Sequence, residues 1–318
     1  MLTESSRRVV LFLGPEYAFR TTAALFDESI QFIYCDEFEF LDKICEASAI
    51  IDASLKVPIT NELVSRASNL RIISTATTGS DHIQREEVDR RGIIVRTLKE
   101  DREFLLNITS AAEHTWSIVL ALARNLILAN EEVQKGEWSR ENVPGYMLYG
   151  KTLGIIGCGR IGEWVSRYGN AFGMSIVAYD PYRDSWPSYI VNTTLDDVMV
   201  KSDIISIHVH LNDETRGLVS RQILDKVKQG TVIVNTSRSG VMDESALLDG
   251  LQTGRIGGAG LDVLSGEPNI GNNPLLNYAR HNHNLVITPH CAGYSPEAVQ
   301  IVCRRAAEKV IDCLKNSL

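Results

Sequence analysis

The 318-residue sequence has little of several features that mark whole classes of protein. Its six cysteines form no C-x-x-C pair and no cluster with histidines at metal-ligand spacing, which argues against a disulfide scaffold and against a metal site. No block of basic residues is present and the formal net charge is −8, so no nucleic-acid partner is expected. The apolar run Val9–Leu13 is too short for a signal-peptide core or a membrane span. We therefore expect a cytoplasmic protein with neither metal nor membrane attachment.

The composition that remains is that of a globular protein, with 44% hydrophobic and 23% charged residues over a length typical of two domains. Short apolar runs alternate with segments of helical composition along the chain. This pattern predicts an α/β fold with two doubly wound parallel sheets. The predicted strands are Val9–Leu13, Phe32–Tyr34, Ile50–Ala53, Ile72–Thr75, Ile93–Val95, Leu153–Ile156, Ser175–Tyr179, Ile204–His208, Thr231–Asn235, Gly258–Asp262 and Leu285–Thr288.

One predicted helix is unusually apolar. It runs from Ser110 to about Lys135, and its apolar residues must be buried inside the fold or against a second copy of the chain. We interpret His114 and Trp116 within it as packing residues. Two other helices have clear start signals, with Asp243 as an N-cap and Ser295 followed by proline.

A G-x-G-x-x-G pattern follows the strand Leu153–Ile156 and opens a helix, with glycines at 157, 159 and 162. Such glycines allow a tight turn, a close approach of backbone to a pyrophosphate, and close packing of helix on strand. Asp180 ends the next strand, where a carboxylate accepts hydrogen bonds from ribose hydroxyls. The pattern predicts NAD, because a carboxylate there repels the extra phosphate of NADP. Arg183 leaves the NADP alternative open.

The loop after the fourth predicted strand, residues 75–81, is made of small residues and a glycine. At the carboxyl end of a parallel strand, such a loop exposes backbone N–H groups to an anion. The alternative is an ordinary turn that leads into a helix capped by Asp81.

Three chemically versatile side chains follow predicted strands of the second half: Arg238, Glu267 and His290. Because open parallel sheets bind ligands beyond the carboxyl ends of their strands, we expect the three to lie together. Arg238 can hold a substrate carboxylate or carbonyl, and His290 can exchange a proton with an oxygen at the reacting carbon. Glu267 can orient the imidazole and favour its charged form.

Four ordered motifs resemble the D-isomer-specific 2-hydroxyacid dehydrogenase family: GKTLGIIGCGRIG with Asp180, NTSRSGVMDESAL, GGAGLDVLSGEP and TPHCAGYS. The resemblance implies a flavodoxin-like substrate domain of residues 1–107 and 294–318, with a Rossmann NAD-binding domain of residues 108–293 inserted into it. It implies reversible reduction of a 2-oxo acid to the D-2-hydroxy acid, and a homodimer. The implied catalytic residues are Arg238, Glu267 and His290.

The resemblance also implies the residues that bind ligands. Ala76, Thr77, Thr78 and Gly79, with Arg238, correspond to the part of the family that binds the substrate carboxylate. The implied cofactor contacts are Gly157, Gly159, Arg160, Ile161, Gly162, Asp180, Thr236, Ser237, Arg238, Asp262, His290 and Gly293.

Two departures and two alternatives remain. The family's Pro-Gly turn before the long helix is replaced by RTLKEDREFLLNITS, which leaves the identity of the substrate open, and His210 stands where the family has proline.

An NADH-sensing binding protein of the C-terminal binding protein type is the first alternative function, although the chain carries little beyond its expected first strand and last helix. A phosphite-oxidising relative is the second. Glutamate at 267 argues against a formate dehydrogenase, which carries glutamine there.

Overall fold

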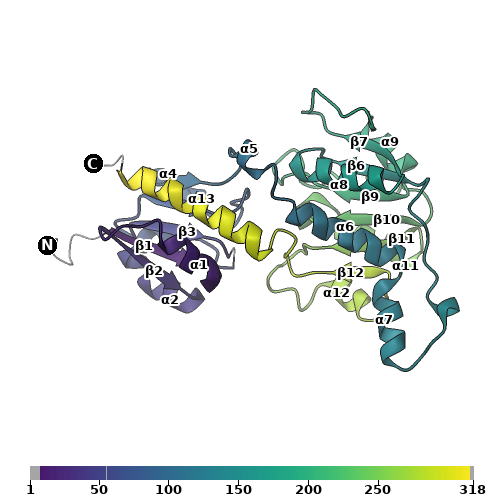
Figure 1. The fold of residues 1–318 in the computed structure, drawn as a ribbon, viewed down its shortest axis with the longest axis horizontal. Coiled ribbons are helices and arrows are strands. Elements are labelled where there is room, and N and C mark those ends of the chain that lie inside the picture. Colours follow the sequence, from purple (N-terminus) through teal and green to yellow (C-terminus); the bar gives the residue numbers. More distant parts are fainter. Residues whose placement is uncertain (1–7, 55, 316–318) are drawn as a thin grey trace. The chain divides into compact units, whose positions relative to one another are not determined.

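The structure, a computed structural model, describes residues 8–54 and 56–315. The chain divides into two compact units, residues 1–107 with 294–318 and residues 108–293 (Figure 1). The predictions that concern the first seven residues and the end of the last helix beyond Lys315 lie outside the described residues. Within the described ranges, no helix is long and apolar enough to cross a membrane.

The sheet of the first unit is wholly parallel, with strand order β2-β1-β3-β4-β5. This is the flavodoxin-like order expected for this half, and all five predicted strands are confirmed. Their buried residues alternate between the two faces, so each face of the sheet has its own apolar core. The strands are β1 (Arg8–Leu13), β2 (Ile30–Cys35), β3 (Ala49–Asp52), β4 (Ile72–Thr75) and β5 (Ile94–Arg96).

Helices cover both faces of this sheet, and α13 belongs to this unit although it lies at the far end of the sequence (Figure 1). Its residue Ala306 accepts a hydrogen bond from the buried hydroxyl of Ser74 on β4 at 3.0 Å. The predicted cap at Ser295 is present, since its hydroxyl accepts from the N–H of Ala298. The helices are α1 (Glu16–Ala23), α2 (Glu37–Lys43), α3 (Asn61–Arg66), α4 (Arg85–Arg90), α5 (Arg102–Leu105) and α13 (Pro296–Lys315), with a 3₁₀ turn η2 (Ile44–Glu46).

The segment that departs from the family pattern is fastened to α13 by ion pairs. The half-buried carboxylate of Asp101 contacts both Lys309 and Arg305, the latter at 2.8 Å. Burial alone would raise the pKa of Asp101, but its bonds to the two cations lower it, so the carboxylate stays charged. Lys309 also donates to the carbonyl of Thr97 at 2.6 Å. These contacts fix the start of the segment within the first unit.

The sheet of the second unit is also parallel, in the order β12-β11-β10-β9-β6-β7-β8. The order reverses beside β6, which is the Rossmann arrangement, and it confirms the predicted fold class. One short edge strand, β8, was not predicted. The strands are β6 (Thr152–Ile156), β7 (Ser175–Tyr179), β8 (Ile190–Asn192), β9 (Ile204–Ile207), β10 (Thr231–Asn235), β11 (Ile256–Leu261) and β12 (Leu285–Ile287).

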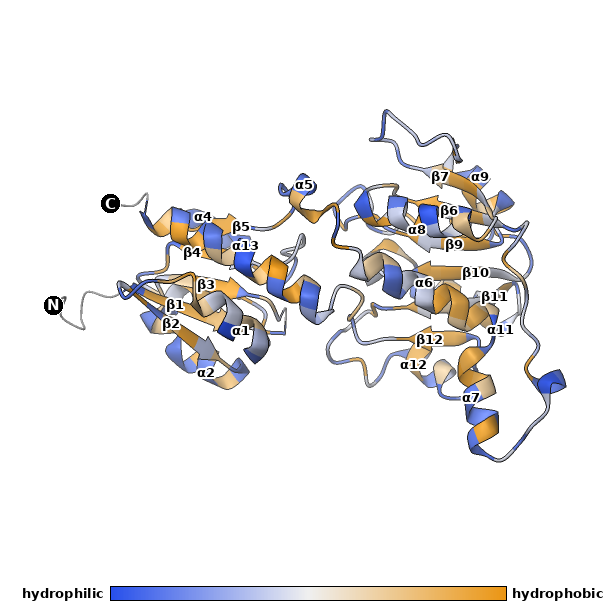
Figure 2. Ribbon diagram, in the orientation of Figure 1, coloured by the Kyte–Doolittle hydropathy of each residue, from blue (hydrophilic) through white to orange (hydrophobic). Residues whose placement is uncertain are grey.

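Helices pack on both faces of this second sheet, and the strands are among the most hydrophobic segments of the chain (Figure 2). The predicted N-cap is present, because Asp243 accepts from the N–H of Ala246 at 2.9 Å. The helices are α6 (Ser110–Ala123), α7 (Leu126–Gln134), α8 (Arg160–Ala171), α9 (Leu195–Lys201), α10 (Arg221–Leu224), α11 (Glu244–Gln252) and α12 (Pro274–Ala279), with 3₁₀ turns η3 (Arg140–Asn142) and η4 (Ser239–Val241).

The single long helix predicted for residues 110–135 is wrong. Asn125 adopts a left-handed conformation with φ 47° and separates α6 from α7. The apolar face of α6 is buried within the unit, and Trp116 packs on the rings of Tyr168 and Phe172, as predicted for a packing residue. In contrast, α7 has no buried residue. The apolar side chains that stay exposed in this region are therefore those of α7 and not those of α6.

One part of the alternative interpretation of the loop at residues 75–81 is also wrong, namely the helix cap at Asp81. Helix α4 begins at Arg85 and its N-cap is Gln84, so Asp81 does not cap it. Asp81 instead precedes an isolated parallel bridge between Ile83 and Ile59.

Candidate active site

The glycine turn between β6 and α8 gives each glycine a different environment. Gly157 has φ +87°, a conformation that suits glycine. A Cβ atom on Gly162 would lie 2.2 Å from the carbonyl oxygen of Gly157, so only glycine fits there. A Cβ on Gly159 would meet nothing within 4 Å, which leaves that side of the turn open. The turn therefore offers the N-terminus of α8 to a ligand from the side of Gly159.

The first residue of α8 is Arg160. The guanidinium of Arg160 is buried and donates to the carbonyl of Ile108, and burial lowers its pKa. Its side chain is thus engaged inside the unit, and the part of Arg160 that remains for a phosphate is its backbone N–H.

Asp180 lies directly beside the glycine turn. Its carboxylate accepts the N–H of Cys158 at 2.9 Å and the N–H of Tyr182 at 3.0 Å. Arg183 is the residue that kept the NADP alternative open in the sequence. Its side chain is engaged in contacts within the second unit. It pairs with Glu163 at 2.7 Å, donates to the carbonyl of Cys158, and lies over the ring of Trp186.

Arg238 stands on a loop that its neighbours hold rigidly after β10. The buried side chain of Asn235 donates to the carbonyl of Arg238 at 3.0 Å and accepts from the N–H and hydroxyl of Ser237. Thr236 shares a hydrogen bond of 2.8 Å with Thr115 of α6. These contacts fix the backbone of residues 235–238 and present the Arg238 side chain beyond the strand.

Of the three side chains predicted to lie together, Glu267 and His290 are in direct contact. The Nδ1 atom of His290 lies 3.1 Å from each carboxylate oxygen of Glu267, and both side chains are about one-third exposed. His290 has φ 52°, a positive value that is uncommon for a residue with a side chain. With Nδ1 committed to the carboxylate, Nε2 is the ring nitrogen that remains for proton exchange.

The loop that carries His290 is held by the buried carboxylate of Asp262. This carboxylate accepts the N–H of Cys291 at 2.9 Å, the N–H of Ala292 at 2.7 Å and the hydroxyl of Thr288. Burial alone would raise the pKa of Asp262, but hydrogen bonds from His114, Thr288 and the two backbone N–H groups lower it. The carboxylate is therefore charged and acts as an anchor for residues 288–292.

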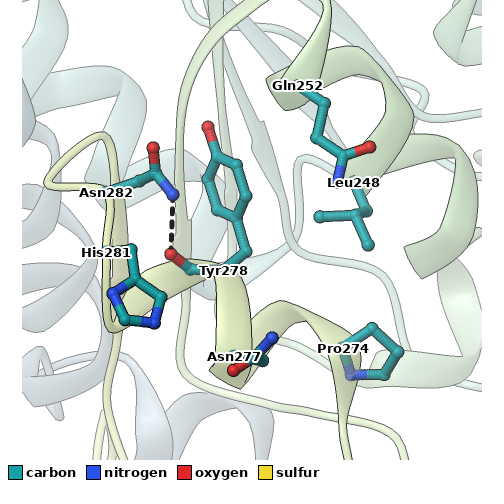
Figure 3. A pocket seen from close by; sticks show the side chains of 7 residues that line it. All are labelled: Leu248, Gln252, Pro274, Asn277, Tyr278, His281 and Asn282. Atoms are coloured by element: carbon teal, nitrogen blue, oxygen red, sulfur yellow. Dashed lines mark hydrogen bonds between the residues drawn. The ribbon is translucent and has the colours of Figure 1, made fainter.

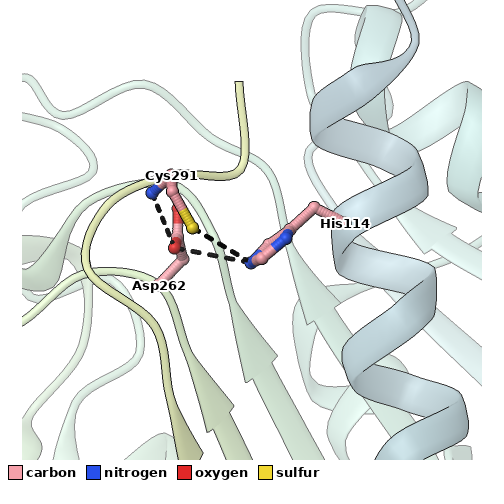
Figure 4. A group of neighbouring side chains, drawn as sticks. All are labelled: His114, Asp262 and Cys291. Atoms are coloured by element: carbon pink, nitrogen blue, oxygen red, sulfur yellow. Dashed lines mark hydrogen bonds and ion pairs between the residues drawn. The ribbon is translucent and has the colours of Figure 1, made fainter. Parts of the chain in front are cut away.

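The sequence did not predict that His114 makes polar contacts in this region. Its Nε2 atom lies 3.0 Å from the hydroxyl of Thr288, 3.5 Å from Asp262 and 4.0 Å from the sulfur of Cys291 (Figure 4). Interpretation as a packing residue is wrong, because the imidazole is a member of a polar network and is one-quarter exposed. It is 174 residues from Thr288, so no spacing pattern could have shown the contact.

In the first unit, the loop after β4 has backbone N–H groups that can donate to a ligand. Ala76 differs from the prediction, because its N–H is donated to the carbonyl of Asp52 at 2.8 Å. For Thr77, Thr78 and Gly79, no N–H partner is found among the described residues. Beside this loop, the buried carboxylate of Asp52 pairs with His82 at 2.9 Å, a contact that sequence reasoning also missed.

The histidine that directly follows β9 in the second unit is neutral. His208 is bonded to the hydroxyl of Ser206 at 2.8 Å, and burial lowers its pKa to about 3. It supplies no proton near pH 7.

A surface hollow of about 380 Å³ lies between α11 and α12 in the second unit (Figure 3). None of the predicted site residues lines it. Its lining is neutral apart from one histidine and comprises Leu248, Gln252, Pro274, Asn277, Tyr278, His281 and Asn282.

Comparison with known proteins places the chain in a family. Residues 116–292 match the sequence profile of the D-isomer specific 2-hydroxyacid dehydrogenase, NAD binding domain. This match covers more than half of the chain, so the protein belongs to the D-isomer-specific 2-hydroxyacid dehydrogenase family, and the resemblance inferred from its motifs is confirmed. The matched domain is the NAD-binding one, which confirms the predicted cofactor.

Individual relatives agree with this placement. A D-3-phosphoglycerate dehydrogenase of Bacillus subtilis is 34% identical over 285 residues, which cover 88% of this chain and 51% of the relative. One of Methanocaldococcus jannaschii is 35% identical, again over 88% of this chain and over 52% of its own length. The chain thus spans about half the length of the curated relatives it matches. Among solved structures, the D-lactate dehydrogenase of Aquifex aeolicus, complexed with NAD and lactic acid, has a TM-score of 0.82 and 28% identity over 96% of each chain.

Proposed function

We propose that the protein is an NAD-dependent oxidoreductase that reversibly reduces a small 2-oxo acid to the D-2-hydroxy acid. The observation that carries this proposal is the pairing of His290 with Glu267, on loops that follow neighbouring strands of the NAD-binding domain. The names of the relatives, D-3-phosphoglycerate dehydrogenase and D-lactate dehydrogenase, support the same class of reaction.

Each side chain has its own role in the proposed reaction. Bound NADH supplies a hydride to the carbonyl carbon of the substrate. His290 donates the proton from Nε2 to the carbonyl oxygen, and it takes the proton back in the oxidative direction. Glu267 holds Nδ1–H and stabilises the imidazolium until the proton is transferred. Arg238 binds the substrate carboxylate or carbonyl. In the first unit, the N–H groups of residues 77–79 are the donors that the loop after β4 offers to a carboxylate.

The cofactor contacts are proposed residue by residue. The N–H groups of the glycine turn and of the first turn of α8 bind the pyrophosphate, and the carboxylate of Asp180 accepts from the ribose hydroxyls. The remaining contacts would come from the loops beyond β10, β11 and β12. They are Thr236, Ser237, Arg238, Asp262, His290 and Gly293.

A pair of glycine variants tests the cofactor turn. We expect Gly159→Ala to fold normally, since its Cβ meets nothing within 4 Å, and to weaken NADH binding by about 10–100-fold. The methyl group would stand where backbone approaches the pyrophosphate. Fluorescence titration of NADH measures the effect. Gly271→Ala, at another open glycine of the same unit, is the matched control. Unchanged NADH affinity in Gly159→Ala would remove the turn from the site.

The choice between NAD and NADP is tested at Asp180. We expect Asp180→Ala to weaken NADH binding by about tenfold or more and to affect NADPH less, because the charged acceptor for the ribose hydroxyls is lost together with its repulsion of a 2′-phosphate. Dissociation constants for both cofactors check this, with the exposed neighbour Asp184→Ala as control. An unchanged ratio of the two constants would contradict the assigned role.

A phosphorylated substrate would need basic side chains that can contact its phosphate. Arg71 precedes β4 and so stands at the amino edge of the sheet, opposite the candidate loop. Lys99 and Arg102 follow β5 and are exposed, so they are the candidates for contact with a phosphate.

A panel of substrates tests the function directly. NADH oxidation should be measured with glyoxylate, pyruvate, hydroxypyruvate, 2-oxoglutarate and phosphohydroxypyruvate, and NAD⁺ reduction with phosphite. Turnover of a 2-oxo acid supports the proposal and names the substrate class. Turnover of phosphite alone would favour the phosphite-oxidising alternative. Tight NADH binding without turnover of any compound would favour an NADH-sensing binding protein.

We further propose a cytoplasmic homodimer. The apolar side chains of α7 and of the segment that follows it are exposed, and Figure 2 shows hydrophobic bands along α7. The exposed residues are Leu126, Ile127, Val133, Trp138, Met147 and Tyr149. We expect a dimer in sedimentation velocity, and we expect Val133→Glu to shift it toward the monomer because a buried charge disfavours association. A monomeric unmodified protein at micromolar concentration would exclude this interface.

A further inference from the structure

Three side chains with metal-binding chemistry meet in the second unit, although the sequence keeps them far apart. They come from α6, from the residue after β11 and from the loop after β12 (Figure 4). The Nε2 atom of His114 lies 3.5 Å from Oδ1 of Asp262 and 4.0 Å from Sγ of Cys291. All three ligand atoms lie within 4.8 Å of one another. Cys291 is 177 residues from His114, so no local sequence motif could predict this group of side chains.

These separations are close to those of a tetrahedral zinc site. Zinc binds nitrogen and oxygen at about 2.1 Å and sulfur at about 2.3 Å, so tetrahedral angles place nitrogen and oxygen about 3.4 Å apart and nitrogen and sulfur about 3.6 Å apart. The nitrogen–oxygen and nitrogen–sulfur distances differ from these by only a few tenths of an ångström, and the oxygen and sulfur atoms lie within 4.8 Å of each other. The carboxylate is buried, but the imidazole is one-quarter exposed and the thiol is half-buried, so an ion can enter from solvent.

We propose that His114, Asp262 and Cys291 form a binding site for a divalent cation of the zinc class. A thiolate, an imidazole and a carboxylate together select borderline-soft ions such as Zn²⁺ and Co²⁺ over Mg²⁺ or Ca²⁺, which prefer oxygen ligands alone. Three protein ligands leave the fourth tetrahedral position to water or to a small anion.

Binding changes the protonation of the cluster. Burial and the charge of Asp262 raise the pKa of the Cys291 thiol, so the ion displaces a proton that the free protein keeps at neutral pH. The Nε2 atom of His114 must also present its lone pair, which ends any donation to the hydroxyl of Thr288.

Occupancy would also disturb the neighbouring chemistry, a consequence that rests on the proposed function. Asp262 anchors the N–H groups of Cys291 and Ala292, which directly follow His290. An ion that draws the carboxylate and the thiolate together would shift this loop and would compete with cofactor contacts at Asp262. We expect Zn²⁺ to inhibit NADH oxidation and a chelator to restore it.

Cobalt spectroscopy tests the site without any assay of activity. Titration of the full chain with Co²⁺ should give a thiolate-to-cobalt charge-transfer band and tetrahedral visible bands. Both should be lost in Cys291→Ser and in Cys291→Ala, and His114→Gln should weaken binding by at least about tenfold. Cys45→Ser is the matched control, because Cys45 is an exposed cysteine of the first unit. A charge-transfer band that persists in both Cys291 variants, or one that disappears with Cys45, overturns the proposal.

A second measurement separates the metal site from the proposed function. If Co²⁺ gives the Cys291-dependent band and no 2-oxo acid is turned over, the site stands and the proposed function fails. If a 2-oxo acid is turned over and Co²⁺ gives no thiolate band, the site fails and the function stands. If Zn²⁺ binds through Cys291 without inhibiting turnover, the inhibitory consequence is excluded.

Discussion

Replacing His290 with alanine is expected to lower kcat for NADH oxidation by about 10²–10⁴-fold, the usual contribution of a positioned proton donor. The change removes the imidazole that lies 3.1 Å from both carboxylate oxygens of Glu267. Since hydride transfer to a carbonyl leaves a negative oxygen without this proton, the loss should fall mainly on kcat. The dissociation constant of NADH should change far less. Steady-state kinetics with the best substrate of the panel, together with NADH titration, separates the two quantities.

The chain provides a matched control for this variant. His283 lies 3.6 Å from Glu131 in the same unit, so it is also a histidine beside a glutamate, but no site motif contains it. His283→Ala should leave kcat unchanged within experimental error. A fall of less than tenfold in His290→Ala, or an equal fall in the control, would exclude His290 as the proton donor.

Glu267→Gln examines the partner of that histidine. Glutamine can still accept a hydrogen bond from Nδ1 but carries no charge to stabilise the imidazolium, so kcat should fall by about tenfold or more while the dissociation constant of NADH changes little. A kcat equal to that of the unmodified protein would show that the carboxylate does not act through the imidazole.

Much of the fold and of this triad was accessible from the sequence, for a physical reason. Buried parallel strands are short apolar runs, so β6 and β10 stand out, and side chains that follow such strands meet at one edge of the sheet. Arg238, Glu267 and His290 are predicted as candidates in that way, and the contact between Glu267 and His290 is observed. Strand β8 was missed because only Ile190 of its three residues is buried. The break at Asn125 was missed because neither glycine nor proline marks it.

The contacts that the sequence could not supply are those between distant segments. His114 meets Thr288 across 174 residues, and nothing in the local pattern of α6 distinguishes a histidine that bonds to a loop from one that packs on a sheet. The same holds for Asp52 and His82 in the first unit, where the end of β3 meets the loop that follows β4. Such tertiary contacts depend on the whole fold, whereas the period of apolar residues is a local property.

Asp262→Ala is expected to destabilise the second unit by about 3 kcal/mol, because a group that loses its hydrogen-bond acceptor costs about 1–3 kcal/mol. The carboxylate accepts from the N–H groups of Cys291 and Ala292 and from the hydroxyl of Thr288. Urea unfolding followed by tryptophan emission measures this unit selectively, since the chain's tryptophans all lie within residues 108–293, at 116, 138, 164 and 186. Asp249→Ala, at an exposed carboxylate paired with Arg221, should cost less than about 1 kcal/mol.

The effect of Asp262 should also depend on pH with a definite sign. The folded-state pKa of this carboxyl is lowered from its ordinary value of 3.8, so the folded protein binds the proton less readily than the unfolded chain. Its contribution to stability is therefore complete above that ordinary value and is lost as the pH falls through the lower, folded-state pKa. The difference in unfolding free energy between the unmodified protein and Asp262→Ala should be constant from pH 7 to pH 5 and should shrink below about pH 4. A difference that grew in acid would mean that Asp262 is protonated in the folded state, and the anchor of the His290 loop would then be a neutral hydrogen-bonded group.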